Sequence, residues 1–165
     1  MPEKETIERA REDAAEGKSA STQAGEFVRE EIHHIREGKH GARSAKQAIA
    51  IGLSKARRAG VKLGVPKKGK ASARTRRQAA RDTAKGRRKQ TPSPRRSRAM
   101  LARLRREGRA AASPAALGRQ ARSSARRRTA KARSASAKAA ARTKGPAVRR
   151  AAARKAARTR ARRAS

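Results

Sequence analysis

The sequence lacks cysteine, tyrosine and tryptophan and contains a single phenylalanine. Without cysteine, the chain can form neither a disulfide bond nor a thiolate site for a metal ion or for catalysis. The lone aromatic residue is too little for the base stacking by which many single-strand binders hold nucleic acid. The longest nearly apolar stretch, Ala48–Leu53, is much shorter than the roughly 20 residues of a membrane-spanning helix. We therefore expect no membrane span, and the charged N-terminus is not typical of a secretory signal.

Acidic residues are also scarce, and they are unevenly distributed. The 165 residues include 49 Lys and Arg against 12 Asp and Glu, a formal net charge of +37. Residues 1–65 hold 13 basic and 10 acidic residues, a net charge of +3, which leaves +34 for residues 66–165. A segment with so much charge and so few large apolar residues tends to stay disordered. We therefore predict that the chain consists of two parts. Residues 1–65 form a small helical module, and residues 66–165 form a disordered basic tail.

Three helices are predicted within residues 1–65. The first, about residues 3–16, has one large apolar residue, so it is expected to be solvated and fraying. The second begins after Ser21 and Thr22 and ends near residue 37, with an apolar stripe along one side. The third follows a capping box at residue 44 and ends near residue 59, with Gly52 on a face that another helix could approach closely.

The simplest arrangement of these helices is an antiparallel hairpin of the second and third. Its few large apolar residues each gain about 1.5–3 kcal/mol on full burial, whereas ordering each residue costs about 1–2 kcal/mol. We therefore expect the hairpin to form a homodimer through residues 21–63 or to fold against a partner. The predicted fold class is all-α: an N-terminal hairpin of two or three helices, followed by a long basic Ala/Arg/Lys tail that is largely disordered but has a helix-forming tendency.

The tail is predicted to bind nucleic acid through the phosphate backbone. Each phosphate neutralised releases counterions, and phosphate contacts do not read sequence. The shortage of aromatics favours double-stranded DNA over RNA. The residues expected to carry binding are the clustered basic positions of the tail, supplemented by three on the third helix: Arg126, Arg127, Arg128, Arg149, Arg150, Arg154, Lys155, Arg158, Arg160, Arg162 and Arg163, with Lys55, Arg57 and Arg58.

The three histidines do not predict a metal site. His33 and His34 are adjacent and diverge by about 100° on a helix, and His40 lies in an expected loop. We interpret Glu30 and His34 as an exposed pair spaced by four residues. The chain also lacks a glycine-rich phosphate loop and a nucleophile–base spacing, so we expect no enzyme, no cofactor and no small-molecule substrate.

Ser21–Leu63, which contains TQAGEFVREEIHHIREGKHGARSAKQAIAIGLSKARRAGV, resembles the core of a family of small basic bacterial proteins of unknown function. The tail, with runs such as AKAAARTK, is similar to the C-terminal domains of linker histones and to bacterial histone-like proteins. These resemblances imply a histone-like protein of the bacterial nucleoid, in the cytoplasm, that binds and compacts DNA. The alternative is a protein-interaction module that the tail tethers to RNA, ribosomes or the chromosome.

Overall fold

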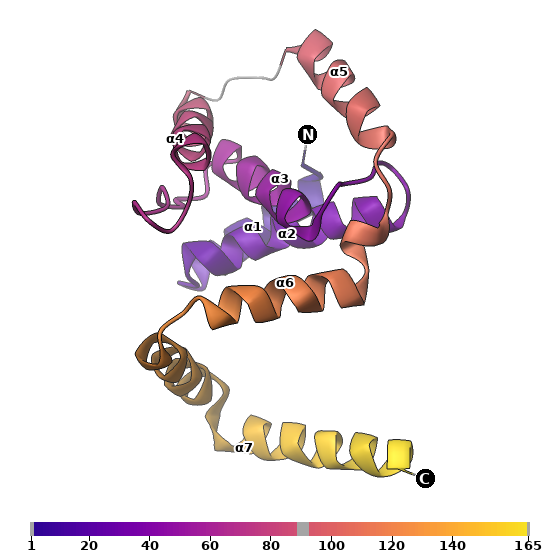
Figure 1. Ribbon diagram of the computed structural model, residues 1–165. Coiled ribbons are helices and arrows are strands. Elements are labelled where there is room, and N and C mark those ends of the chain that lie inside the picture. Colours follow the sequence, from indigo (N-terminus) through magenta and orange to yellow (C-terminus); the bar gives the residue numbers. More distant parts are fainter. Residues whose placement is uncertain (1, 89–92, 165) are drawn as a thin grey trace. The chain divides into compact units, whose positions relative to one another are not determined.

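The computed structural model describes residues 2–88 and 93–164, apart from the side chains at positions 143, 144, 163 and 164. Every regular element in these residues is helical (Figure 1). Within them, no helix is both long enough and apolar enough to cross a bilayer. In chain order the elements are α1 (Lys4–Ala15), α2 (Ala20–Arg36), α3 (Ala45–Arg58), α4 (Ala73–Arg87), α5 (Pro94–Arg105), the 3-10 helix η1 (Ala110–Ala112), α6 (Pro114–Arg126) and α7 (Ala130–Ala164).

The chain divides into two compact units, Met1–Gln120 and Ala121–Ser165. The boundary that the charge distribution suggested, between residues 65 and 66, therefore falls inside the first unit. That unit contains α1 to α5, η1 and the first half of α6, and the second contains the rest of α6 and all of α7.

The all-helical class is as predicted, but the prediction of a largely disordered tail is wrong. Helices α4 to α7 occupy most of residues 66–165. Side-chain caps help to begin them: Ser72 Oγ accepts a hydrogen bond from the Thr75 amide at 3.1 Å, and Ser113 Oγ accepts one from the Ala116 amide at 3.2 Å. The prediction of disorder rested on the small number of large apolar side chains. Alanine, which is abundant in these residues, favours the helix and can itself be buried where a neighbouring segment lies close.

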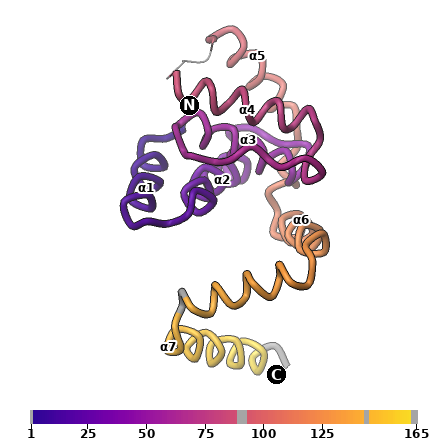
Figure 2. Tube along the Cα trace, turned by 90° about the vertical axis from the view of Figure 1, so that its left-hand side faces the viewer, coloured from indigo at the N-terminus to yellow at the C-terminus, as the bar shows by residue number. Residues whose placement is uncertain are grey.

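The predicted hairpin of α2 and α3 is the centre of the first unit, and the two helices lie side by side in Figures 1 and 2. Phe27 and Ile35 are almost fully buried between the elements. Gly52 allows the close approach that the sequence predicted, because a Cβ atom there would lie 2.7 Å from the Cα atom of Val28. The N-cap of α2 is Ser19, slightly earlier than expected, and Ser44 caps α3 as predicted.

Helix α1 is not the solvated, fraying helix that its composition suggested. It packs against α2, and Thr6 and Ala10 are buried. Ile7 joins a cluster with Ala10, Ala24 and Phe27. One large apolar residue is enough here because the small side chains around it let α1 lie close to α2.

Residues 104–117, which we call the closing segment, cover the other end of the hairpin. The Leu104 carbonyl accepts a hydrogen bond from the Gly41 amide at 2.9 Å, and the Gly108 carbonyl accepts one from Ala42 at 3.1 Å. Ala111 and Ala112 pack into a cluster that contains residues of α2. The hairpin thus buries its apolar face against distant parts of the same chain, whereas the homodimer through residues 21–63 stays a prediction.

Candidate nucleic-acid interface

Helix α7 carries more positive charges than any other helix that the structure describes. Its 35 residues include 13 Lys and Arg and no acidic residue. The basic side chains that the structure describes there are all exposed. No apolar face interrupts the charge, since Val148 is the one aliphatic residue larger than alanine and its side chain is also exposed. The helix therefore offers cations in every direction around its axis.

A break divides α7 into two helical segments. Gly145 has φ 65° and ψ 170°, outside the helical region, and Pro146 follows it. Proline has no amide hydrogen and cannot donate to the preceding turn, so the Gly-Pro pair ends one segment and starts the next.

Four arginines form a row along the second segment of α7. Arg150, Arg154, Arg158 and Arg162 are spaced by four residues and are exposed. Residues spaced by four are neighbours on a helix surface, and like charges at this spacing repel one another. We refer to these four residues as the arginine row.

The other predicted tail residues also lie in the second unit. Arg126 ends α6, and Arg127 and Arg128 lie between α6 and α7; all three are exposed. Four further predicted residues lie on α7 beside the arginine row: Arg149, Lys155, Arg160 and Arg163. The first three of these are exposed, and the Arg163 side chain lies outside the described residues.

The three basic residues proposed on α3 have internal partners instead. Lys55 Nζ pairs with Glu30 Oε1 at 3.0 Å and with Glu31 Oε2 at 2.8 Å. Arg58 Nη2 lies 2.8 Å from Asp82 Oδ1, which joins α3 to α4. Arg57 is buried and donates to the carbonyl oxygens of its own helix and of the following loop. These side chains stabilise the first unit and are not part of the candidate interface.

Two of these internal pairs keep their groups charged. Burial alone would lower the pKa of Lys55, but its hydrogen bonds and ion pairs with Glu31 and Glu30 raise the pKa above its usual value. Burial alone would raise the pKa of Asp82, whereas hydrogen bonds from Ser54, Arg58 and Gln78 lower it overall. The charges of Lys55 and Asp82 are therefore balanced by partners inside the first unit.

Sequence reasoning missed a buried polar cluster on α2. Glu30 and Glu31 are buried, so the interpretation of Glu30 as an exposed residue is wrong. Glu31 lies four residues from both Phe27 and Ile35, on the apolar side of the helix. This spacing of four residues in the sequence could have predicted that Glu31 is buried. His40 is also buried, and its ring lies 6.1 Å from that of His34.

Comparison with known proteins shows similarity to one protein family. A family model described as "Family of unknown function (DUF6496)" matches residues 17–69. The matched residues contain α2 and α3, and the description assigns them no activity. Searches of curated proteins and of solved structures found no match.

Proposed function

We propose that the protein binds double-stranded DNA through its phosphates, without sequence preference, and compacts it as a histone-like nucleoid-associated protein. The observation that supports this most directly is α7, in which 13 basic residues have no acidic residue to pair with inside the helix. Their mutual repulsion destabilises the helix, and bound phosphates would remove that repulsion.

The spacing of charge in α7 suits a phosphate backbone. Residues 146–164 contain eight basic residues over about 28 Å of helix, at 1.5 Å per residue. This is one positive charge per about 3.5 Å, close to the one phosphate per 3.4 Å of each DNA strand. A segment of this kind can neutralise phosphates along a strand or bridge two duplexes, because its cations point to all sides.

The lack of sequence preference follows from how the arginines are held. Arginine reads guanine by a forked pair of hydrogen bonds that requires a fixed guanidinium group. In the arginine row the side chains are exposed, and α7 has no acidic residue that could fix them. Contacts to phosphate tolerate such freedom, and contacts to base edges do not.

The test is fluorescence anisotropy of the full chain with short duplexes of unrelated sequence, at several salt concentrations. Replacing Arg150, Arg154, Arg158 and Arg162 together with Ala should weaken binding and make the slope of log K against log salt shallower by up to about 3.6, at 0.9 per phosphate. Replacing the same four residues with Lys keeps the charge and is the matched control, which should keep both affinity and slope.

Two results would count against the proposal. Unchanged affinity and slope in the alanine variant would remove α7 from the interface. A wild-type chain that ignores duplex DNA at moderate salt, but binds RNA or a protein, would favour the interaction module tethered by its tail.

A further inference from the structure

Glu31, His34 and His40 come together at the end of α2 and in the loop that follows it. Glu31 and His34 are three residues apart on α2, which places them on one face of the helix. The chain turns after α2 at Gly38, and His40 comes back to pack at 8% exposure. Each of the three residues offers one ligand atom, and these atoms all lie within 4.8 Å of one another.

The Glu31 carboxylate is fully buried and poorly satisfied. Its exposed fraction is 0%, and apart from the ion pair with Lys55 neither of its oxygens has a hydrogen-bond partner among the residues that the structure describes. Its nearest cation, Lys55, lies 2.8 Å from Oε2 but also pairs with the buried Glu30 at 3.0 Å. Two buried carboxylates thus share one lysine. Because an uncompensated buried charge is costly, this arrangement favours an additional cation beside Glu31.

The hydrogen bonds of His40 direct one ring nitrogen at that carboxylate. Nδ1 lies 3.1 Å from the Gly41 carbonyl oxygen and donates to it, which leaves Nε2 as the acceptor nitrogen. Nε2 faces Glu31 Oε1 at 3.4 Å. Ligand atoms of a tetrahedral zinc ion with bonds of 2.0–2.1 Å are about 3.3 Å apart. The Glu31–His40 separation therefore matches one edge of such a site, while Oε2 keeps its contact with Lys55.

The His34 ring is also oriented by a hydrogen bond, which it forms with a residue outside the cluster. Its Nε2 lies 2.8 Å from Glu3 Oε1, so that a neutral ring donating there has Nδ1 as its ligand nitrogen. A carboxylate that holds the second nitrogen of a histidine is the usual support for a metal ligand. His34 Nδ1 also lies 3.9 Å from Glu30 Oε1, and Lys39 contacts the Glu3 carboxylate at 3.2 Å.

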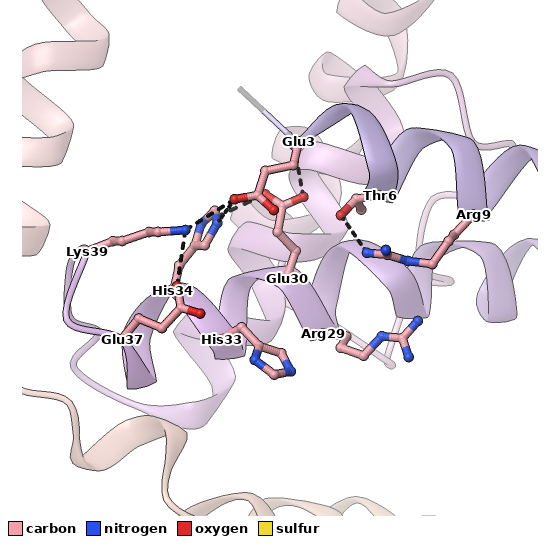
Figure 3. A pocket seen from close by; sticks show the side chains of 9 residues that line it. All are labelled: Glu3, Thr6, Arg9, Arg29, Glu30, His33, His34, Glu37 and Lys39. Carbon is pink, nitrogen blue, oxygen red and sulfur yellow. Dashed lines mark hydrogen bonds and ion pairs between the residues drawn. The ribbon is translucent and has the colours of Figure 1, made fainter.

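Solvent can reach His34 through a pocket. His34 lines a pocket of about 350 Å³ together with Glu3 and Glu30 (Figure 3). The His34 side chain is 12% exposed, in contrast to the fully buried Glu31. An ion therefore has a polar path to His34, and a water molecule from the pocket can complete its coordination.

We propose that Glu31, His34 and His40 bind a divalent zinc ion. Two imidazoles and one carboxylate are donors that zinc prefers, with a fourth position left to water. The ion would balance the second buried carboxylate and would tie the loop after α2 to the helix. This proposal is independent of DNA binding.

The test is zinc titration of the full chain after treatment with a chelator, by competition with a chromophoric chelator. We expect one zinc ion per chain. His34→Gln and His40→Gln should each weaken binding by at least about tenfold, the least that loss of even an outer partner costs. His33→Gln removes the neighbouring histidine, which is exposed and outside the cluster, and should leave zinc affinity unchanged.

Circular dichroism of each variant reports whether it folds, and thermal unfolding gives a second measurement. Zinc should raise the Tm of the wild type and of His33→Gln but not of His34→Gln. If His40→Gln does not fold, the partly exposed His34→Gln decides the result. Absence of stoichiometric zinc binding would overturn the proposal, and so would an equal loss of affinity in His33→Gln, which would indicate adventitious binding to surface histidines.

Discussion

Asp82 shows how a single acidic residue can organise a segment that is otherwise almost entirely basic. It is 1% exposed and accepts hydrogen bonds from Ser54 at 2.7 Å and from Arg58 at 2.8 Å, both on α3. Gln78, one turn earlier on α4, donates to both carboxylate oxygens. One carboxylate therefore joins α3 to α4 through hydrogen bonds from both helices.

The stability that Asp82 contributes should depend on pH. Its hydrogen bonds lower its pKa in the folded state below the value of about 3.9 for an unfolded chain. Its contribution is therefore complete above that value and is lost as the pH falls through the folded-state pKa. We expect Asp82→Asn to be less stable than the wild type near neutral pH, by about 2 kcal/mol, the scale of a charged hydrogen bond.

Urea unfolding, followed by circular dichroism at a series of pH values, measures this difference. The gap between the two proteins should narrow as the pH decreases below about 4, where Asp82 of the unfolded chain begins to take up a proton while Asp82 of the folded protein is still ionised. A gap that stays constant down to the most acidic pH would contradict the role assigned to the carboxylate.

Helices α2 and α3 show that small residues control packing at the scale of the element. A Cβ atom at Gly52 would meet the backbone of Val28, which cannot move as a flexible side chain can. In the same hairpin, a Cβ atom at Gly25 would have no atom within 4 Å among the described residues. Two glycines, both inside helices, thus have different roles.

Gly52→Ala should destabilise the protein and Gly25→Ala should not. Alanine improves helix propensity by about 1 kcal/mol at either position, but at Gly52 overpacking costs about 1–3 kcal/mol. We expect net destabilisation at Gly52 and a neutral or stabilising effect at Gly25. Thermal unfolding of the two variants beside the wild type gives the comparison. Equal shifts in Tm would indicate that α2 and α3 do not approach as closely as described.

At the scale of the whole molecule, the first unit depends on contacts between residues far apart in the sequence. The closing segment brings residues 104–117 onto α2 and the loop after it, and Arg36 Nε donates to the Ala112 carbonyl oxygen at 3.0 Å. Glycine is required at position 41, because a Cβ atom there would overlap the Glu107 carbonyl oxygen. The hairpin is thus completed by a part of the chain that composition alone assigned to a disordered tail.

Substitutions of two leucines of α5 test whether the closing segment covers the hairpin. Leu104 is 7% exposed and Leu101 is 37% exposed. Leu104→Ala should lower the free energy of unfolding by about 2 kcal/mol, at the low end for a buried leucine because the segment is short. Leu101→Ala should change it by no more than about 0.5 kcal/mol. Urea unfolding of the full chain measures both values, and two equally small effects would mean that residues 104–117 do not cover the hairpin.

The sequence alone was enough to predict the local features of the chain. The helical class, the Ser44 cap and the concentration of charge in the second part depend on residues that are close to one another in the sequence, so each can be predicted from a local pattern. The two central helices were found for the same reason, because a stripe of large apolar residues repeats with the helical period.

The tertiary structure decided which small and charged residues are buried. Ala112, Asp82, Glu31 and His40 look like solvent-exposed residues when composition is the guide, and each is buried by a neighbour from another part of the chain. Periodicity cannot show such contacts, because alanine and glycine carry almost no hydrophobic signal and long-range pairing leaves no local pattern. Close approach of backbones, set by Gly41 and Gly52, is the physical reason that a chain so rich in charge folds around so few large apolar side chains.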